Sequence, residues 1–272
     1  MPVLKRLLFF FYLSIYTYGF CQTNWNIAPM TCRLDAAPGD TVMQTIIVTN
    51  NDNKDRDFLV YAKDWRYTID GEDVETEDSN ESRGLLNWIS FAPSQFTVPA
   101  GGSEAVRLQV NVPDTSDAGF FWGGIYIAPD EPPVLASRIG RTEGAYEIYV
   151  RIRAKANILV TVQGVLEYSG QVNWVEAEPD SAGSGIIVKT RFENTGNMLL
   201  RCTGTVDIRD ANDETVDSFE MDNFNVLPGY EREVVSRREM ELAPGTYSAL
   251  VVVDFKGDYL VAGEAFFEIP GR

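Results

Sequence analysis

The same order of strands and turns occurs twice along this chain of 272 residues. In each copy a strand ends at an asparagine, a turn with an aromatic residue, Val, Pro and Gly follows, and a Pro/Gly turn begins an apolar strand. Short strands between turn residues are typical of β-sandwiches. The repeat therefore predicts two β-sandwich domains of one type, with copies at residues 46–50, 96–101 and 113–127 and at residues 188–194, 224–229 and 244–253.

The chain begins with a segment typical of a secretory signal peptide. Two basic residues precede an apolar run over residues 7–18, and Gly19 and Cys21 supply the small residues of a cleavage site. We predict a signal peptide over residues 1–21. Lipid modification of Cys21 is an alternative, although bulky Phe20 stands where lipoprotein signals have a small residue. An uncleaved membrane anchor is a second alternative, although the run is shorter than the roughly 20 residues of a spanning helix. No later stretch is apolar over such a length, so no membrane span is expected in the mature chain.

The chain is strongly acidic. It has 23 Lys and Arg against 40 Asp and Glu, a net charge of −17, and loss of the two cations in residues 1–21 makes it −19. Such a field repels nucleic acid and anionic lipid surfaces. Nucleic-acid binding is therefore excluded, and the charge favours either solubility or a basic partner.

The chain contains no histidine. This absence removes Ser-His-Asp and Cys-His nucleophile systems, His-ligated zinc and the commonest general base near neutral pH. A glycosidase with two carboxylates is the enzyme that remains, but no nucleophile, metal or phosphate motif singles out a pair. We predict a protein that is not an enzyme and that holds no cofactor.

Cys32 and Cys202 remain after signal cleavage, one in each predicted domain. Two isolated cysteines do not make a disulfide framework. We interpret both as small buried hydrophobes, with an inter-domain disulfide as the alternative.

Residues 70–81 hold seven carboxylates and one sizeable aliphatic residue, Val74. Calcium binding is one hypothesis for such a segment. The spacing does not match an EF-hand loop, which alternates its ligands around a glycine and closes with Glu. A solvated loop is the other reading, and we predict no metal site here.

Alternating apolar residues predict the strands of the first domain, residues 22–163. Residues 30–34 and 41–48 are expected to form a hairpin-like pair, and Trp65 to fill the centre of the sandwich. Residues 120–122, three aromatics at the start of a strand, are interpreted as core. The clearest alternation predicts four inward side chains, Val106, Leu108, Val110 and Val112.

A strand over residues 146–155 follows the long, proline-containing connection of residues 127–145. Its two faces differ. One face carries Tyr146, Ile148, Val150, Ile152 and Ala154, and the other carries Arg151, Arg153 and Lys155. Either the three cations pair with carboxylates on a neighbouring strand, or they receive a carboxylate from a partner.

The second domain, residues 164–272, contains seven predicted strands and no long helix. Turn residues at 194–197, 210–213 and 256–258 separate some of them. The strands are expected at residues 172–175, 185–193, 200–209, 215–221, 231–238, 246–255 and 262–269.

The first domain resembles the amino-terminal domain of the PapD-like periplasmic pilus-assembly chaperones. The resemblance rests on the turn at Pro38-Gly39, the strand ending at residues 46–52, the Trp65 strand, residues 88–93 with Phe96, residues 99–108 and the long loop before residue 146. Gly123-Gly124-Ile125 after a proline-rich turn is also similar to WxL-interacting surface proteins. The resemblance implies an all-β chain of two immunoglobulin-like β-sandwich domains in tandem.

The chaperone resemblance also implies a binding site. In that family a cleft between the domains anchors a subunit's terminal carboxylate on two basic residues, and the last strand of the first domain lends apolar side chains by strand addition. Lys155 matches the cleft lysine, and Ile148, Val150 and Ile152 match the donated side chains. The second cation stays open, because alignment on Gly39 and Asn50 places Leu34 rather than Arg33 at the family position, a slip that reverses the face.

The sequence therefore predicts a secreted, non-enzymatic periplasmic chaperone or assembly factor. Its partner would be a secreted or envelope protein subunit, bound at Arg33 and along residues 148–155. The alternative is a structural or adhesive protein of the cell envelope, exposed at the cell surface, in which the two sandwiches are spacers. No pattern specifies the oligomeric state.

Overall fold

The computed structural model describes residues 24–76, 82–139, 146–180 and 185–271. The predicted signal peptide, Cys21 and the last carboxylates of the acidic segment, Glu77, Asp78 and Glu81, lie outside the described residues. All regular elements in the described part are β-strands, which confirms the all-β fold class. In those ranges we find no helix with the length and apolar character that crossing a membrane requires.

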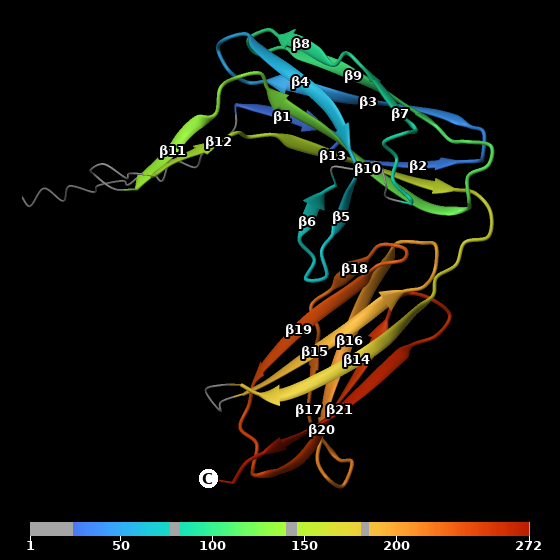
Figure 1. Ribbon diagram of the computed structural model, residues 1–272, viewed down its shortest axis with the longest axis vertical. Helices are drawn as coiled ribbons and strands as arrows, with labels where there is room; N and C mark the ends of the chain where they lie inside the picture. Colours follow the sequence, from blue (N-terminus) through green and yellow to red (C-terminus); the bar gives the residue numbers. More distant parts are fainter. Residues whose placement is uncertain (1–23, 77–81, 140–145, 181–184, 272) are drawn as a thin grey trace, which may run out of the picture.

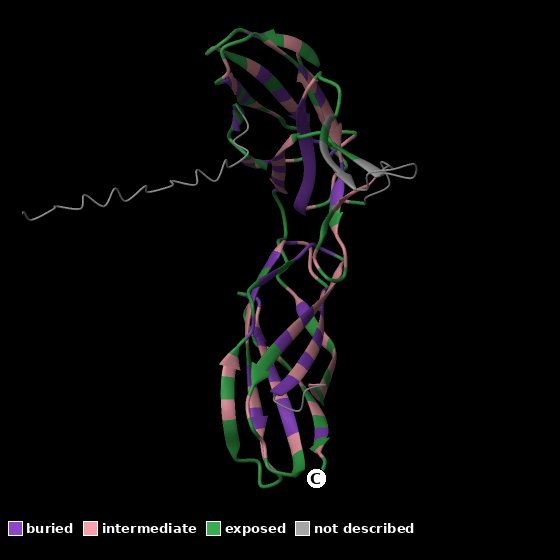
Figure 2. Cartoon of the chain, turned by 90° about the vertical axis from the view of Figure 1, so that its left-hand side faces the viewer, coloured by how far each residue is buried: buried purple, intermediate pink, exposed green. Residues whose placement is uncertain are grey.

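The first domain is a sandwich of two sheets (Figure 1). One sheet has the order β1 (Trp25–Ala28), β3 (Thr41–Asn50), β9 (Ser103–Asn111) and β7 (Ile89–Ala92). The other has the order β2 (Thr31–Ala36), β13 (Ala154–Val162), β10 (Gly119–Pro129), β4 (Arg56–Lys63) and β8 (Gln95–Val98). Buried side chains from both sheets form one core, and β10 is the continuous buried ribbon of this domain in Figure 2.

The predicted pairing of residues 30–34 with residues 41–48 is wrong. β1 takes the place beside β3, with Ile27 opposite Val48. β2 lies in the other sheet, parallel to β13, where Cys32 is beside Ile158. Pro29 separates β1 from β2 and cannot donate a hydrogen bond to a ladder, so the chain changes sheets there.

A buried asparagine ends the strand in each copy of the repeat. In the first domain the Asn50 side chain is fully buried, and its Nδ2 donates to the carbonyl oxygens of Val98 at 3.1 Å and Lys54 at 2.7 Å. Its Oδ1 accepts from the amide of Asp52 at 3.0 Å. The amide thus ties the strand end to the turn before Pro99.

The second domain repeats this arrangement. Asn194 is also fully buried, and its Nδ2 donates to the carbonyl oxygens of Met198 and Val226, both at 2.8 Å. Its Oδ1 accepts from the amide of Gly196 at 3.0 Å. Two copies of one sequence pattern therefore make the same buried hydrogen bonds.

The second domain contains the seven predicted strands and a short eighth, β18 (Phe224–Val226). β14 (Gly170–Pro179), β15 (Gly185–Asn194) and β19 (Glu231–Glu239) form one sheet. The other contains β17 (Thr215–Glu220), β16 (Leu200–Arg209), β20 (Gly245–Asp254) and β21 (Val261–Ile269), with β18 also paired to β16. A separate core fills this sandwich.

A third buried cluster joins the two domains. It contains Trp65, Phe120, Trp122, Met198 and Leu227. Trp65 therefore does not fill the centre of the first sandwich as predicted. Of the three aromatics at residues 120–122, the middle one belongs to the sandwich core and the outer two face the second domain, because side chains alternate along β10.

Both described cysteines are free and buried, as the hydrophobe interpretation predicts. Burial raises the pKa of the Cys32 thiol. It raises that of Cys202 to about 12, with a smaller contribution from Asp254. Neither thiol is therefore suited to forming a thiolate near neutral pH.

Candidate protein-binding surface

The structure divides the segment predicted as one strand over residues 146–155. β12 (Tyr146–Val150) pairs with β11 (Val134–Ile139) in a separate hairpin, and β13 begins only at Ala154. The hairpin projects from the side of the first domain in Figure 1. The reason is that β10, the neighbour of β13, ends at Pro129, after which the prolines of the connection support no ladder.

The hairpin and the residues after it expose large apolar side chains. The exposed fractions are 45% for Ile148, 57% for Tyr149, 43% for Val150 and 44% for Ile152. Ile148 and Val150 lie on the same side of β12, because successive side chains of a strand alternate. The sequence prediction of an apolar face at these three aliphatic positions therefore falls on a solvent-exposed part of the chain.

The same segment has an open strand edge. Within the described residues β12 pairs only with β11, and β2 covers the edge of β13 only from Asn157 onward. Along β13 the side chains of Ala156, Ile158 and Val160 are fully buried in the core. Apolar residues thus continue from the sandwich core along β13, through the junction at residues 151–153, and into β12, whose outer edge has no strand partner in the described residues.

Two of the three predicted cations pair with carboxylates of the same chain. Arg153 Nη1 lies 3.1 Å from Glu75 Oε2 and also donates to the hydroxyl of Tyr61 at 3.1 Å. Lys155 pairs with Asp73. The partners come from β6 (Asp73–Glu75), which forms a hairpin with β5 (Trp65–Tyr67). Of the two alternatives predicted for the cations, pairing with carboxylates of a nearby strand therefore applies to Arg153 and Lys155.

The environment of these pairs is aromatic. The Lys155 ammonium lies 4.1 Å from the ring centroid of Trp65, and the Arg153 guanidinium lies 5.2 Å from that of Tyr126. The hydrogen bond with Tyr61 raises the pKa of Arg153 most, burial opposes it, and the interaction with Glu75 raises the pKa further. Both cationic groups therefore lie over the faces of aromatic rings, where a cation–π attraction adds to the ion pairs.

Arg151 differs from these two cations. It is exposed, and among the described residues it has no hydrogen-bond or ion-pair partner. Its position between β12 and β13 places a positive charge that is unpaired within the described ranges beside the exposed Val150 and Ile152.

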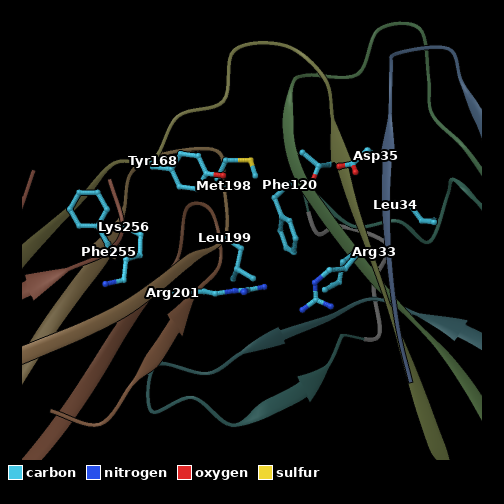
Figure 3. A pocket seen from close by; sticks show the side chains of 12 residues that line it. Arg33, Leu34, Asp35, Phe120, Tyr168, Met198, Leu199, Arg201, Phe255 and Lys256 are labelled. Carbon is cyan, nitrogen blue, oxygen red and sulfur yellow. The ribbon is translucent and has the colours of Figure 1, made fainter. Parts of the chain in front are cut away.

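A cavity of about 360 Å³ lies between the two domains (Figure 3). From the first domain it is lined by Arg33 and Phe120, and from the second by Tyr168, Arg201 and Lys256. Arg33 therefore does face the cleft, beside Leu159 of β13. Lys155 is not among the residues that line this cavity, and its match to the family's cleft lysine stays a prediction.

The second domain supplies the other cations of the cleft. Figure 3 shows the guanidinium groups of Arg33 and Arg201 turned toward one another. Neither has an ion-pair partner in the described ranges of the chain, whereas Lys256 pairs with Asp254 at 2.7 Å. Asp35 contributes one carboxylate to the lining. In a chain with 40 carboxylates, two unpaired arginines in one cleft are suited to receiving an anion.

Sequence reasoning missed Arg201 and Lys256. Alternation around buried Cys202 could place Arg201 on the outside of its sandwich, because neighbours in a strand point to opposite faces. The inter-domain cluster determines which end of the second domain contacts the first. No local sequence pattern predicts that contact.

No protein-family model and no curated protein matches this sequence. Among solved structures, the chain is similar to one from a chaperone–tip adhesin complex of CFA/I fimbriae, with 14% identity, a TM-score of 0.46 and coverage of 92% of this chain and all of that one. It is also similar to the chaperone YadV, with 10% identity, a TM-score of 0.45 and coverage of 90% and 100%.

A third similar structure is the CsuC–CsuE chaperone–tip adhesion subunit complex from the archaic Csu pili of Acinetobacter baumannii. Here the identity is 13%, the TM-score is 0.42 and the coverage is 78% of this chain and 89% of that one. The solved structures that this chain is similar to are thus mostly PapD-like fimbrial chaperones.

Proposed function

We propose that this chain is a secreted periplasmic chaperone or assembly factor that binds an extended segment of a secreted or envelope protein subunit by strand addition. The observation that carries the proposal is the open edge of β12 next to exposed apolar side chains. An added strand would satisfy the free backbone groups of that edge and cover Ile148, Val150 and Ile152.

The size of the apolar contribution can be estimated from exposure. Each of the three aliphatic side chains is close to half exposed, so covering it contributes roughly 1 kcal/mol, about half the value for full burial. The backbone ladder adds its hydrogen bonds along the strand. Arg151 would attract a carboxylate of the bound segment, since it is the cation at this junction without a described partner.

The inter-domain cleft supports an anchor for the end of the segment. The open edge ends where β2 begins, and Thr31 and Arg33 of β2 line the space between the domains. A terminal carboxylate there would meet Arg33 together with Arg201. In this proposal Lys155 and Arg153 have an indirect role, because they hold β6 in place beside the junction.

Capture of a partner from a cell-envelope extract tests the function. We expect the immobilised chain to retain a secreted protein, and Ile152→Asp to weaken that capture at least tenfold, because a carboxylate would have to be buried under the added strand. Val216→Asp is the matched control, since Val216 on β17 is 46% exposed and remote from the hairpin in Figure 1. Equal capture by both variants would refute strand addition at this site.

A further inference from the structure

The β5–β6 hairpin reaches from the first domain to the second (Figure 1). Its base is fixed in the first domain, where Trp65 is buried and its carbonyl oxygen accepts a hydrogen bond of 2.6 Å from the indole of Trp122. One side of the hairpin carries the carboxylates that pair with the start of β13, Asp73 with Lys155 and Glu75 with Arg153.

The tip of the hairpin lies against the second domain. The carbonyl oxygen of Ile69 accepts a backbone hydrogen bond of 2.7 Å from the amide of Glu233 in β19. β19 pairs with β15 on its other side, so the tip covers part of an otherwise open strand edge.

The backbone conformation at the tip favours Gly71 over a residue with a side chain. Its φ is +85°, and a Cβ there would overlap the guanidinium of Arg232. Burial lowers the pKa of Arg232, and the charge of Asp70 in the tip acts in the opposite direction. The guanidinium of Arg232 therefore packs against the backbone of the turn at Gly71, so the tip is in contact with the second domain rather than surrounded by solvent.

We propose that the β5–β6 hairpin is a brace that sets the orientation of the two domains and links the start of β13 to β19. Two ion pairs with Arg153 and Lys155 fix one end of the hairpin. The other end is fixed by the backbone hydrogen bond between Ile69 and Glu233 and by the packing of Arg232 against the turn. The brace stands on contacts within the free chain, so it does not depend on the proposed partner.

A tip-shortened variant tests the brace. Replacing residues 68–72 by Asn-Gly keeps Tyr67 opposite Asp73 in a two-residue hairpin while removing the contact with β19. Inter-domain distances can be measured by pulsed EPR between spin labels at Met43→Cys and Phe266→Cys, both 74% exposed, in the full chain with Cys21→Ser. Cys32 and Cys202 stay unlabelled because they are buried.

We expect the shortened tip to make the distance distribution roughly twice as wide, since small inter-domain interfaces permit relative motion. The control replaces residues 210–214, a turn of equal length between β16 and β17, by Asn-Gly, and should leave the distribution unchanged. If shortening disrupts folding, Arg232→Ala serves instead. A distribution of unchanged width in a folded variant would overturn the brace.

The link between the two ends has its own test. Asp73→Asn with Glu75→Gln removes the ion pairs at β13 without touching β19. We expect the amide of Glu233 to exchange its hydrogen about fivefold faster, because the variant also removes the pair of Glu75 with Lys63, and the three partly exposed ion pairs together contribute about 1 kcal/mol to keeping the hairpin closed. Unchanged exchange at Glu233 would show that the ends are independent.

Discussion

Replacing Arg33 and Arg201 together by alanine is expected to weaken binding of the captured partner roughly a hundredfold. The two guanidinium groups face one cleft from different domains, and neither has an ion-pair partner among the described residues. A hydrogen bond to a charged group contributes about 1.5 kcal/mol at the lower end of its range, so losing two costs about 3 kcal/mol, or two powers of ten. Titration calorimetry with the partner recovered from envelope extract measures the loss.

Two controls separate the anchor from general charge effects. Arg237→Ala removes an exposed arginine of β19 that does not line the cleft, and it should change the affinity less than twofold. A partner with a few residues appended to its end should bind the wild type as weakly as it binds the double variant, because its carboxylate no longer reaches the cleft. Full affinity of the double variant would contradict the anchor.

Asn194→Ala is expected to lower the free energy of unfolding by about 3 kcal/mol. The substitution leaves the buried carbonyl oxygens of Met198 and Val226 without the Asn194 donor, and the amide of Gly196 keeps only its bond to the carbonyl oxygen of Ser169. Unsatisfied buried groups cost about 1–3 kcal/mol each, and relaxation of the turn recovers part of that sum. Urea unfolding followed by tryptophan fluorescence measures the change.

The neighbouring Thr195→Ala is the matched control. Thr195 is exposed, and its side-chain hydroxyl donates to the hydroxyl of Ser169, so removing that hydroxyl should change stability by less than about 0.5 kcal/mol. Because Asn50 makes the corresponding bonds in the first domain, Asn50→Ala should destabilise that domain to a similar extent. If the asparagine variants had the same free energy of unfolding as the Thr195→Ala control, the buried asparagine of the shared pattern would not stabilise the fold.

Features set by local alternation could be predicted from the sequence. The four side chains predicted to point inward along residues 105–113 are all buried, and Cys32 and Cys202 are buried as well. The repeat predicted the pair of sandwiches because, in each copy, an asparagine at a strand end donates a hydrogen bond to the carbonyl oxygen of the valine that precedes the Pro/Gly turn. All residues of such a hydrogen-bonded unit lie within a few neighbouring strands, so the sequence pattern alone can identify it.

Features that depend on distant parts of the chain could not be predicted. The partner of β2 is decided by a strand more than a hundred residues later, and β13 could be separated from β12 only by knowing where β10 ends. The ion pair of Lys155 could not be predicted for the same reason, since its partner Asp73 belongs to a hairpin inserted after β4. The acidic segment, interpreted as a solvated loop, in fact supplies that hairpin.

Amide hydrogen exchange of β12 in the complex tests strand addition most directly. The amides that point away from β11 have no strand partner among the described residues of the free chain. With the partner bound, their exchange should slow at least tenfold, because a ladder of hydrogen bonds forms along that edge, while the equally open edge of β17 stays unchanged. A bound partner that leaves β12 exchanging at its free rate would contradict the proposal.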